Sequence, residues 1–300
     1  MKPKHAIFLL SICGLSSITA EAVSETPSIA ARSLYAVNES ATDRGSISIY
    51  DIDAGHRLIK TVETVSHVGD VRGVVVSAVT GKLYVAYQDV SGIGMVYCLN
   101  IYDDTIIWNR AVSPGVDRLA INPDGQLLYV PTWEGGSADF INVLDAITGD
   151  VVRKVHFSNR SHDTQYPLSG PIFQETKADD GSGNYLYLID PGGYAVSRVG
   201  PYSGILGPYA VDSISNYAVN NVRDLWTLRS GHGSHWLTFD IKGDYGYVAP
   251  NKYSTDGTEI FDARTHTSVG VIGSSEDLLE IDFANGKITQ VGDQYGIGRR

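Results

Sequence analysis

Two histidines have the spacing in this sequence that most resembles a metal site. His232 and His235 are separated by two residues. Residues three apart on a strand or loop do not automatically share a face, unlike residues on a helix. Zinc needs at least three protein ligands of fixed geometry, and the candidates for a third are His67, His162 and Asp163. The alternative is that these are structural histidines with ordinary hydrogen-bond partners.

Charged residues also recur at one position of a sequence repeat. When the chain is aligned on its Tyr-Val pairs, Arg72, Asp117 and His235 occupy the same position. Arg118 adjoins it, and His232 lies three residues before it in the last repeat. A repeat fold would bring such groups together from different repeats into a concave polar site. The alternative is that Asp and Arg pair between neighbouring repeats and lock the structure.

The composition is that of an ordinary globular chain. The sequence has 300 residues, 43% of them hydrophobic, and a formal net charge of −11. No cluster of Lys and Arg rises above the background, so nucleic acid is not an expected partner. Motifs for haem attachment, phosphate loops, serine hydrolases and zinc proteases are absent, which leaves no cofactor predicted beyond the option of a divalent metal. Cys98, within the apolar run 95–99, is expected to be a buried, inert thiol.

The first residues have the pattern of a secretory signal. Lys2 and Lys4 precede an apolar stretch over residues 6–18, and Ala20-Glu21-Ala22 has the small residues that signal peptidase reads. The stretch is too short for a membrane span, and no later segment resembles one. We therefore expect residues 1–22 to be cleaved and the protein to be secreted or periplasmic.

A short run centred on tyrosine recurs along the chain. Each run follows a turn, β-favouring residues dominate, and helical periodicity is nearly absent. The central residues are Tyr35, Tyr84, Tyr129, Tyr187 and Tyr247, which lie 49, 45, 58 and 60 residues apart. The first two intervals fit one four-stranded blade each, and the longer two indicate insertions or a degenerate blade.

A second phrase alternates apolar and polar residues and ends in Asp. It occurs at residues 45–51, 140–145 and 258–262, and the alternation is typical of a half-buried strand. A short turn follows each, and Asp and Gly supply the Asx turn and the positive φ that a tight hairpin needs. Pro123-Asp124-Gly125 is likewise predicted to be a turn and not a site.

The order of these phrases over residues 122–149 resembles the repeat of the YVTN family. The phrases are Asn-Pro-Asp-Gly, Leu-Tyr-Val, Ile-Asn-Val-Leu-Asp and Ala-x-Thr-Gly. That family resembles the propellers of cytochrome D1 and of the quinoprotein amine dehydrogenase large chain. Residues 236–298 are similar to the end of YncE-like exported proteins. The resemblance covers nearly all of the mature chain but rests on structural repeat residues, so it implies a fold and leaves the function open.

We therefore expect an all-β fold, a single β-propeller of about six four-stranded blades over residues 23–300. Five and seven blades are the alternatives, because residues 221–231 are too few for the blade expected there. Residues 157–183 depart from the repeat and are expected to form an irregular insertion. Long insertions on a propeller commonly supply binding loops.

The expected function is binding of a ligand or partner at the mouth of the central channel. The partner would be a small molecule or another exported protein. One alternative is an enzyme, either a hydrolase or lyase or a redox subunit, that uses His232 and His235 with or without a metal. Another is a purely structural interaction protein. The expected site residues are Arg72, Asp117, Arg118, His162, His232 and His235.

Overall fold

The computed structural model describes residues 30–133, 135–167, 170–177, 184–202, 234–250 and 257–292. Within these ranges the regular structure is entirely β, as the tyrosine-rich runs predict. The same ranges contain no helix that is long and apolar enough to cross a membrane. The signal expected at residues 1–22 and the segment 221–231 lie outside the described residues.

The strands form one eight-stranded sheet and three four-stranded sheets, all antiparallel between neighbours. The large sheet runs in the order β20 (Lys287–Val291), β19 (Asp277–Ala284), β1 (Arg32–Asn38), β2 (Ser40–Asp51), β3 (Arg57–Ser77), β4 (Lys82–Asp89), β5 (Gly94–Asn100) and β6 (Ile106–Ala111). The second contains β7 (Ala120–Ile121), β8 (Leu127–Pro131), β9 (Phe140–Asp145) and β10 (Val151–His156). The third contains β11 (Arg160–Gln165), β12 (Ile172–Lys177), β13 (Asn184–Ile189) and β14 (Val196–Tyr202). The fourth contains β15 (Ser234–Phe239), β16 (Tyr245–Pro250), β17 (Thr258–Asp262) and β18 (Thr267–Ile272).

The eight-stranded sheet consists of two four-stranded units that share the long strand β3. Its first half pairs with β2 and its second half pairs with β4. His67 lies between the halves with a φ of 62°, a conformation that bends the chain and is uncommon outside glycine. The first unit is β19, β1, β2 and the first half of β3, with β20 added beyond β19. The described residues therefore contain five four-stranded units.

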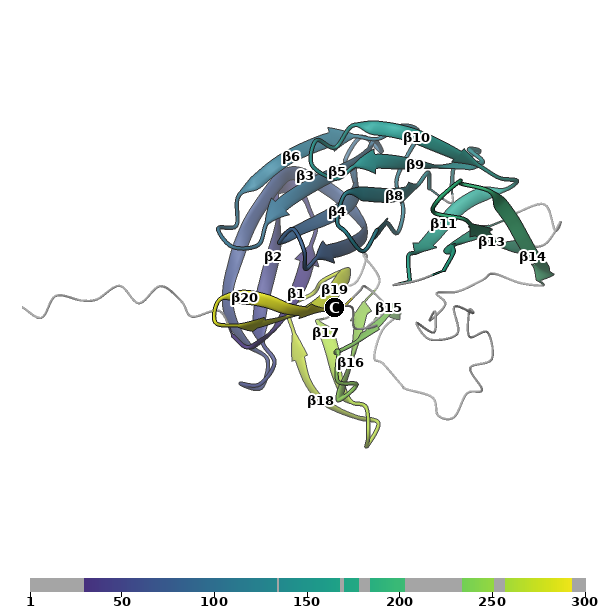
Figure 1. The fold of residues 1–300 in the computed structure, drawn as a ribbon. Helices are drawn as coiled ribbons and strands as arrows, with labels where there is room; N and C mark the ends of the chain where they lie inside the picture. Colours follow the sequence, from purple (N-terminus) through teal and green to yellow (C-terminus); the bar gives the residue numbers. More distant parts are fainter. Residues whose placement is uncertain are drawn as a thin grey trace, which may run out of the picture.

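The units follow one another around a common axis (Figure 1). The first strand of each unit, which we call its inner strand, is β19, the second half of β3, β7, β11 or β15. Strand β15 contacts β19, β19 contacts β3, and β3 contacts β7. Pairing of β1 with β19 joins an early and a late segment of the described chain in one sheet. This arrangement is the expected β-propeller.

The core consists of apolar clusters between adjacent units. One contains Tyr84 and Trp108 of one unit and Leu128 and Leu144 of the next. The Tyr84 hydroxyl donates to the carbonyl of Ala146 across this interface (3.1 Å). The five tyrosines of the recurring run are all buried. They are therefore residues that hold neighbouring blades together.

The predicted turns are formed by side chains that accept backbone hydrogen bonds. Asn122 Oδ1 accepts the amide protons of Gln126 and Leu127 (2.9 Å each), and Gly125 has a φ of 73°. Asp145 Oδ1 accepts those of Ile147 and Thr148 (2.8 and 3.0 Å). These are Asx turns of the kind that Asp and Asn favour.

Two segments differ from the expected repeat. The Tyr187 run forms β13, which is the third strand of its unit, whereas the other four runs form the second strand. Residues 157–183, expected as an irregular insertion, contain β11 and β12 of the same unit. The polar sequence of β11 does not show the apolar alternation of a half-buried strand.

Candidate functional site

Six charged residues from three consecutive units, five of them buried and Arg72 nearly so, lie together around the inner strands. Arg72 lies on β3, Asp117 and Arg118 immediately precede β7, His162 and Asp163 lie on β11, and Glu175 lies on β12. None of these side chains is more than 11% exposed, and that of Asp117 is fully buried. We call this group the axial cluster. It consists of Arg72, Asp117, Arg118, His162, Asp163 and Glu175.

Arg72 and Asp117 form an ion pair between neighbouring units. Arg72 Nη2 donates to both carboxylate oxygens of Asp117 at 3.1 Å. Asp70 lies on the other side of the guanidinium, 3.8 Å from Nη1, and Asp117 Oδ1 also accepts the amide proton of Arg118 (3.1 Å). The sequence places Arg72 and Asp117 at one repeat position, and the ring brings the two into contact. Asp and Arg thus pair between neighbouring repeats, which is the contact that the second interpretation of this position predicts.

Arg118 connects three units. Its Nε lies 3.5 Å from Asp163 Oδ1 on the next unit, and the backbones of the two residues form a parallel β-bridge between the two units. Its guanidinium also stacks on the ring of Trp236, 3.4 Å from the centroid. Trp236 lies on β15, so Arg118 reaches a unit that is not its sequence neighbour. Charge pairing and a cation–π contact therefore fix this side chain.

A β-bulge in β11 brings His162, Asp163 and Glu175 together. Ser161 pairs with Thr176 and Thr164 pairs with Gln174, so two residues of β11 oppose one residue of β12. Successive residues of a regular strand point to opposite faces, and a bulge changes the direction of a side chain. His162 Nδ1 lies 3.6 Å from Asp163 Oδ2 and 3.8 Å from Glu175 Oε1. One donor atom from each residue lies within 4.8 Å of the others.

The cluster stabilises positive charge at His162. Burial disfavours the charged imidazolium, but the carboxylates of Asp163, Glu175 and Asp117 raise the pKa of His162 to about 9. Burial also raises the pKa of the Glu175 carboxyl, with Asp163 adding to this effect and His162 opposing it. The carboxylates of the cluster therefore favour positive charge, or a proton, between them.

Two of the carboxylates lack hydrogen bonds. In the part of the chain that the structure describes, no oxygen of Asp163 or Glu175 accepts one, although all four are buried. A buried carboxylate without such partners is costly, and an unsatisfied group of this kind calls for an explanation such as an ion.

The other expected site residues are placed differently. His232 lies outside the described residues, and His235 lies near the start of β15, where the structure describes only its backbone. His67 is exposed at the bend of β3. Glu175 was not predicted from the sequence. The available signal was a carboxylate within the buried strand run Ile172-Phe173-Gln174-Glu175.

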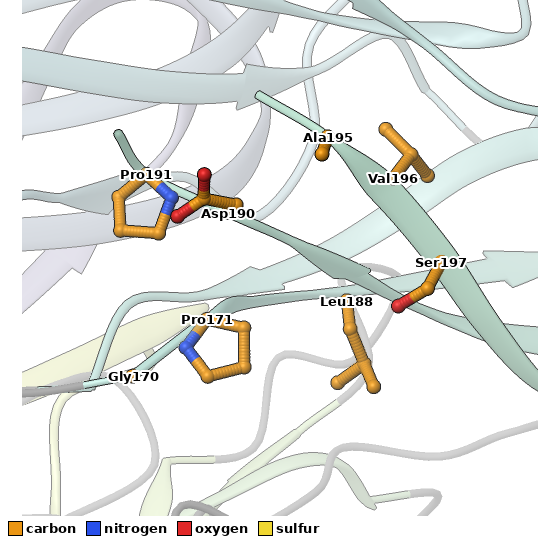
Figure 2. A pocket seen from close by; sticks show the side chains of 8 residues that line it. All are labelled: Gly170, Pro171, Leu188, Asp190, Pro191, Ala195, Val196 and Ser197. Carbon is orange, nitrogen blue, oxygen red and sulfur yellow. The ribbon is translucent and has the colours of Figure 1, made fainter. Parts of the chain in front are cut away.

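A separate cavity of about 650 Å³ lies on the third sheet, along the hairpin of β13 and β14 (Figure 2). Its lining is mainly apolar, and Asp190 is the titratable residue that lines it. The Asp190 carboxylate accepts the amide protons of Gly192 and Gly193 (3.2 and 2.9 Å). That carboxylate therefore serves the turn, and the axial cluster remains the candidate for chemistry.

No family model and no curated protein matches this chain. Among solved structures, it is similar to the β-propeller domain of Cps50 (Swd1) from Myceliophteria thermophila, with 12% identity and a TM-score of 0.48, over 86% of this chain and 97% of that one. It is similar to the dihydro-heme d1 dehydrogenase NirN in complex with DHE, with 14% identity and a TM-score of 0.42, over 89% of this chain and 53% of that one. Hydrazine synthase from Kuenenia stuttgartiensis has 17% identity and a TM-score of 0.42, over 83% of this chain and 77% of that one. These likenesses concern the β-propeller fold and carry no function to this chain.

Proposed function

We propose that this chain is an exported β-propeller of the YVTN type that binds a cationic ligand at the axial cluster. The repeat phrases and the signal-like N-terminus support the family and the export. The observation that carries the proposed function is the convergence of buried carboxylates from consecutive units. The ligand is a small cation or a cationic group of another exported protein.

The net charge of the cluster determines whether its ligand should be positively or negatively charged. Asp70 and Asp117 lie beside the guanidinium of Arg72, Asp163 lies beside that of Arg118, and Glu175 faces His162. Buried charges are tolerated when they are paired. With all four ionised, the carboxylates exceed the two guanidinium groups by two charges. Protons on His162 and Glu175, or a bound divalent cation, balance this excess. An anionic ligand would add to the imbalance, so we exclude it from the proposal.

The proposal is tested by the thermal stability of the purified chain in the presence of three kinds of compound. These are cations (zinc, manganese, spermidine and arginine), anions (phosphate and citrate) and neutral sugars. A ligand that binds only the folded state raises the melting temperature. We expect at least one cation to do so, and the shift to be lost in Asp117→Asn or Glu175→Gln.

Asp150→Asn is the matched control, because Asp150 is an exposed carboxylate that directly precedes β10. It should keep the full shift. The proposal is overturned if no cation stabilises the chain, or if only anions or sugars do. It is overturned as well if both cluster variants keep the shift of the unaltered chain.

A further inference from the structure

We infer that His162, Asp163 and Glu175 form a three-ligand site for a divalent first-row transition metal ion. The inference rests on the proposed function, since it names the cation and its ligands. It assigns one imidazole nitrogen and two carboxylate oxygens to the ion and leaves at least one coordination position open.

The spacing of the donor atoms favours a metal over direct hydrogen bonds. The distances of 3.6 and 3.8 Å from His162 Nδ1 to the carboxylate oxygens exceed the range of a good hydrogen bond. Ligands at about 2.0–2.2 Å from a tetrahedral ion lie about 3.4 Å apart. The two distances from His162 Nδ1 are therefore within a few tenths of an ångström of this spacing, and one donor atom of each residue lies within 4.8 Å of the others.

The two oxygens of Asp163 have separate neighbours. Oδ1 faces Arg118 Nε at 3.5 Å, and Oδ2 faces His162 Nδ1 at 3.6 Å. Arg118 is itself held by Trp236. An outer partner of this kind orients a ligating carboxylate. Oδ2 is thus the oxygen assigned to the metal, and Arg118 is a positioning residue.

Glu175 supplies an independent observation that points to an ion at this site. Its side chain is 2% exposed, and neither of its buried oxygens accepts a hydrogen bond from the described residues. It lies on β12 opposite the bulge that carries the other two ligands. A shared ion would satisfy this carboxylate and that of Asp163 together.

The donor set indicates which ions fit. Imidazole suits zinc, copper, iron and nickel, while carboxylates suit magnesium, calcium and manganese. A mixed set of one nitrogen and two oxygens fits Zn²⁺ and Mn²⁺ better than an all-oxygen ion such as Ca²⁺. We therefore expect Zn²⁺ and Mn²⁺ to bind more tightly than Ca²⁺ and Mg²⁺.

The chain contains an exposed His–Asp pair whose atoms are as far apart as those of His162 and Asp163. His156 Nδ1 lies 3.6 Å from Asp139 Oδ1, and both side chains are more than half exposed. The three-residue group that fits a metal within the described ranges includes neither of them. His156→Ala is therefore a matched control for His162→Ala.

The experiment is metal titration of the purified chain after removal of metal with a chelator. Isothermal titration with zinc chloride and with manganese chloride gives affinity, and elemental analysis of the dialysed protein gives stoichiometry. We expect one equivalent of zinc, with affinity lowered at least 100-fold in Glu175→Gln and in His162→Ala. His156→Ala should bind like the unaltered chain. X-ray absorption at the zinc edge should show nitrogen and oxygen donors with one imidazole.

Each outcome decides the inference. It is overturned if the chain binds no stoichiometric zinc or manganese, if Glu175→Gln binds normally, or if the absorption spectrum shows sulfur or two or more imidazoles. The spectrum of the unaltered chain decides the matter even if a variant fails to fold. If metals do not bind while spermidine or arginine still stabilises the chain through Asp117, the inference fails and the proposed function stands.

Discussion

Replacement of Arg32 should destabilise the fold at the contact between the first and the last unit. Arg32 lies on β1 and is 6% exposed. Its Nε donates to Glu280 on β19 at 2.8 Å, and its Nη2 donates to Asp240, which follows β15. The side chains of both acids are fully buried. The substitution Arg32→Met keeps most of the apolar volume and removes the charge that joins the first unit to the last.

The size of the stability loss follows from the carboxylates of Glu280 and Asp240, which would stay buried without their cation. Each also accepts a backbone amide proton, Asp240 from Tyr245 (2.8 Å) and Glu280 from Ile241 (2.5 Å), so neither turns easily toward water. Breaking a buried ion pair by removing one partner costs about 3–5 kcal/mol. For a chain of this size that loss lowers the melting temperature by roughly 6–20 °C. The control is Arg57→Met, whose side chain is 71% exposed and 3.9 Å from Asp51. It should cost less than about 1 kcal/mol.

The loss should depend on pH in a defined direction. Burial raises the pKa of Glu280 and of Asp240 even with Arg32 present. A carboxyl with a higher pKa in the folded state binds its proton there first. Lowering the pH through that value toward the unfolded value of about 4 therefore adds to the free energy of unfolding. The loss of unfolding free energy in Arg32→Met should be largest above this pH range and become smaller within it.

Urea denaturation at pH 7.5 and pH 5, followed by tryptophan fluorescence, measures both effects. The reasoning is refuted if Arg32→Met loses no more stability than Arg57→Met. It is refuted equally if the deficit of Arg32→Met grows as the pH falls from 7.5 to 5.

Two further predictions concern packing and thiol chemistry. A Cβ at Gly94 would lie 2.7 Å from the backbone of Gly115, so Gly94→Ala should cost about 1–3 kcal/mol in urea denaturation. Gly192→Ala, whose Cβ would meet only a carboxylate at 3.7 Å, should cost less than about 0.5 kcal/mol; equal losses would contradict the packing argument. Burial raises the pKa of Cys98 to about 12, so mass spectrometry after iodoacetamide at pH 8 should find it unmodified when folded and modified in urea. Rapid modification of the folded chain would show that the thiol is accessible.

The fold was predictable because blade residues act locally. The turn at Asn122 forms within five residues, and the tyrosine runs alternate as strands must. The recurrence of the tyrosine run did not show that Tyr187 lies on the third strand of its unit and the other four on the second, because a second and a third strand share the same alternation. Strand β11 was missed for a different reason. Most of its residues are polar or charged and yet buried, whereas the sequence pattern of a buried strand is a run of apolar residues.

The site was predictable in part. Arg72 and Asp117 share a repeat position, and closure of the ring brings such positions together. His162 and Asp163 were candidate ligands, but as adjacent strand residues they should face opposite sides. Only the bulge in β11, which leaves no local signature in the sequence, points them toward Glu175.

The central claim is that the axial cluster holds a cation, and anomalous diffraction tests it most directly. Crystals of the purified chain soaked in zinc chloride would be measured above and below the zinc absorption edge. We predict an anomalous peak about 2.0–2.2 Å from His162 Nδ1, Asp163 Oδ2 and a Glu175 oxygen. A zinc peak elsewhere, or none with the cluster intact, would contradict the account.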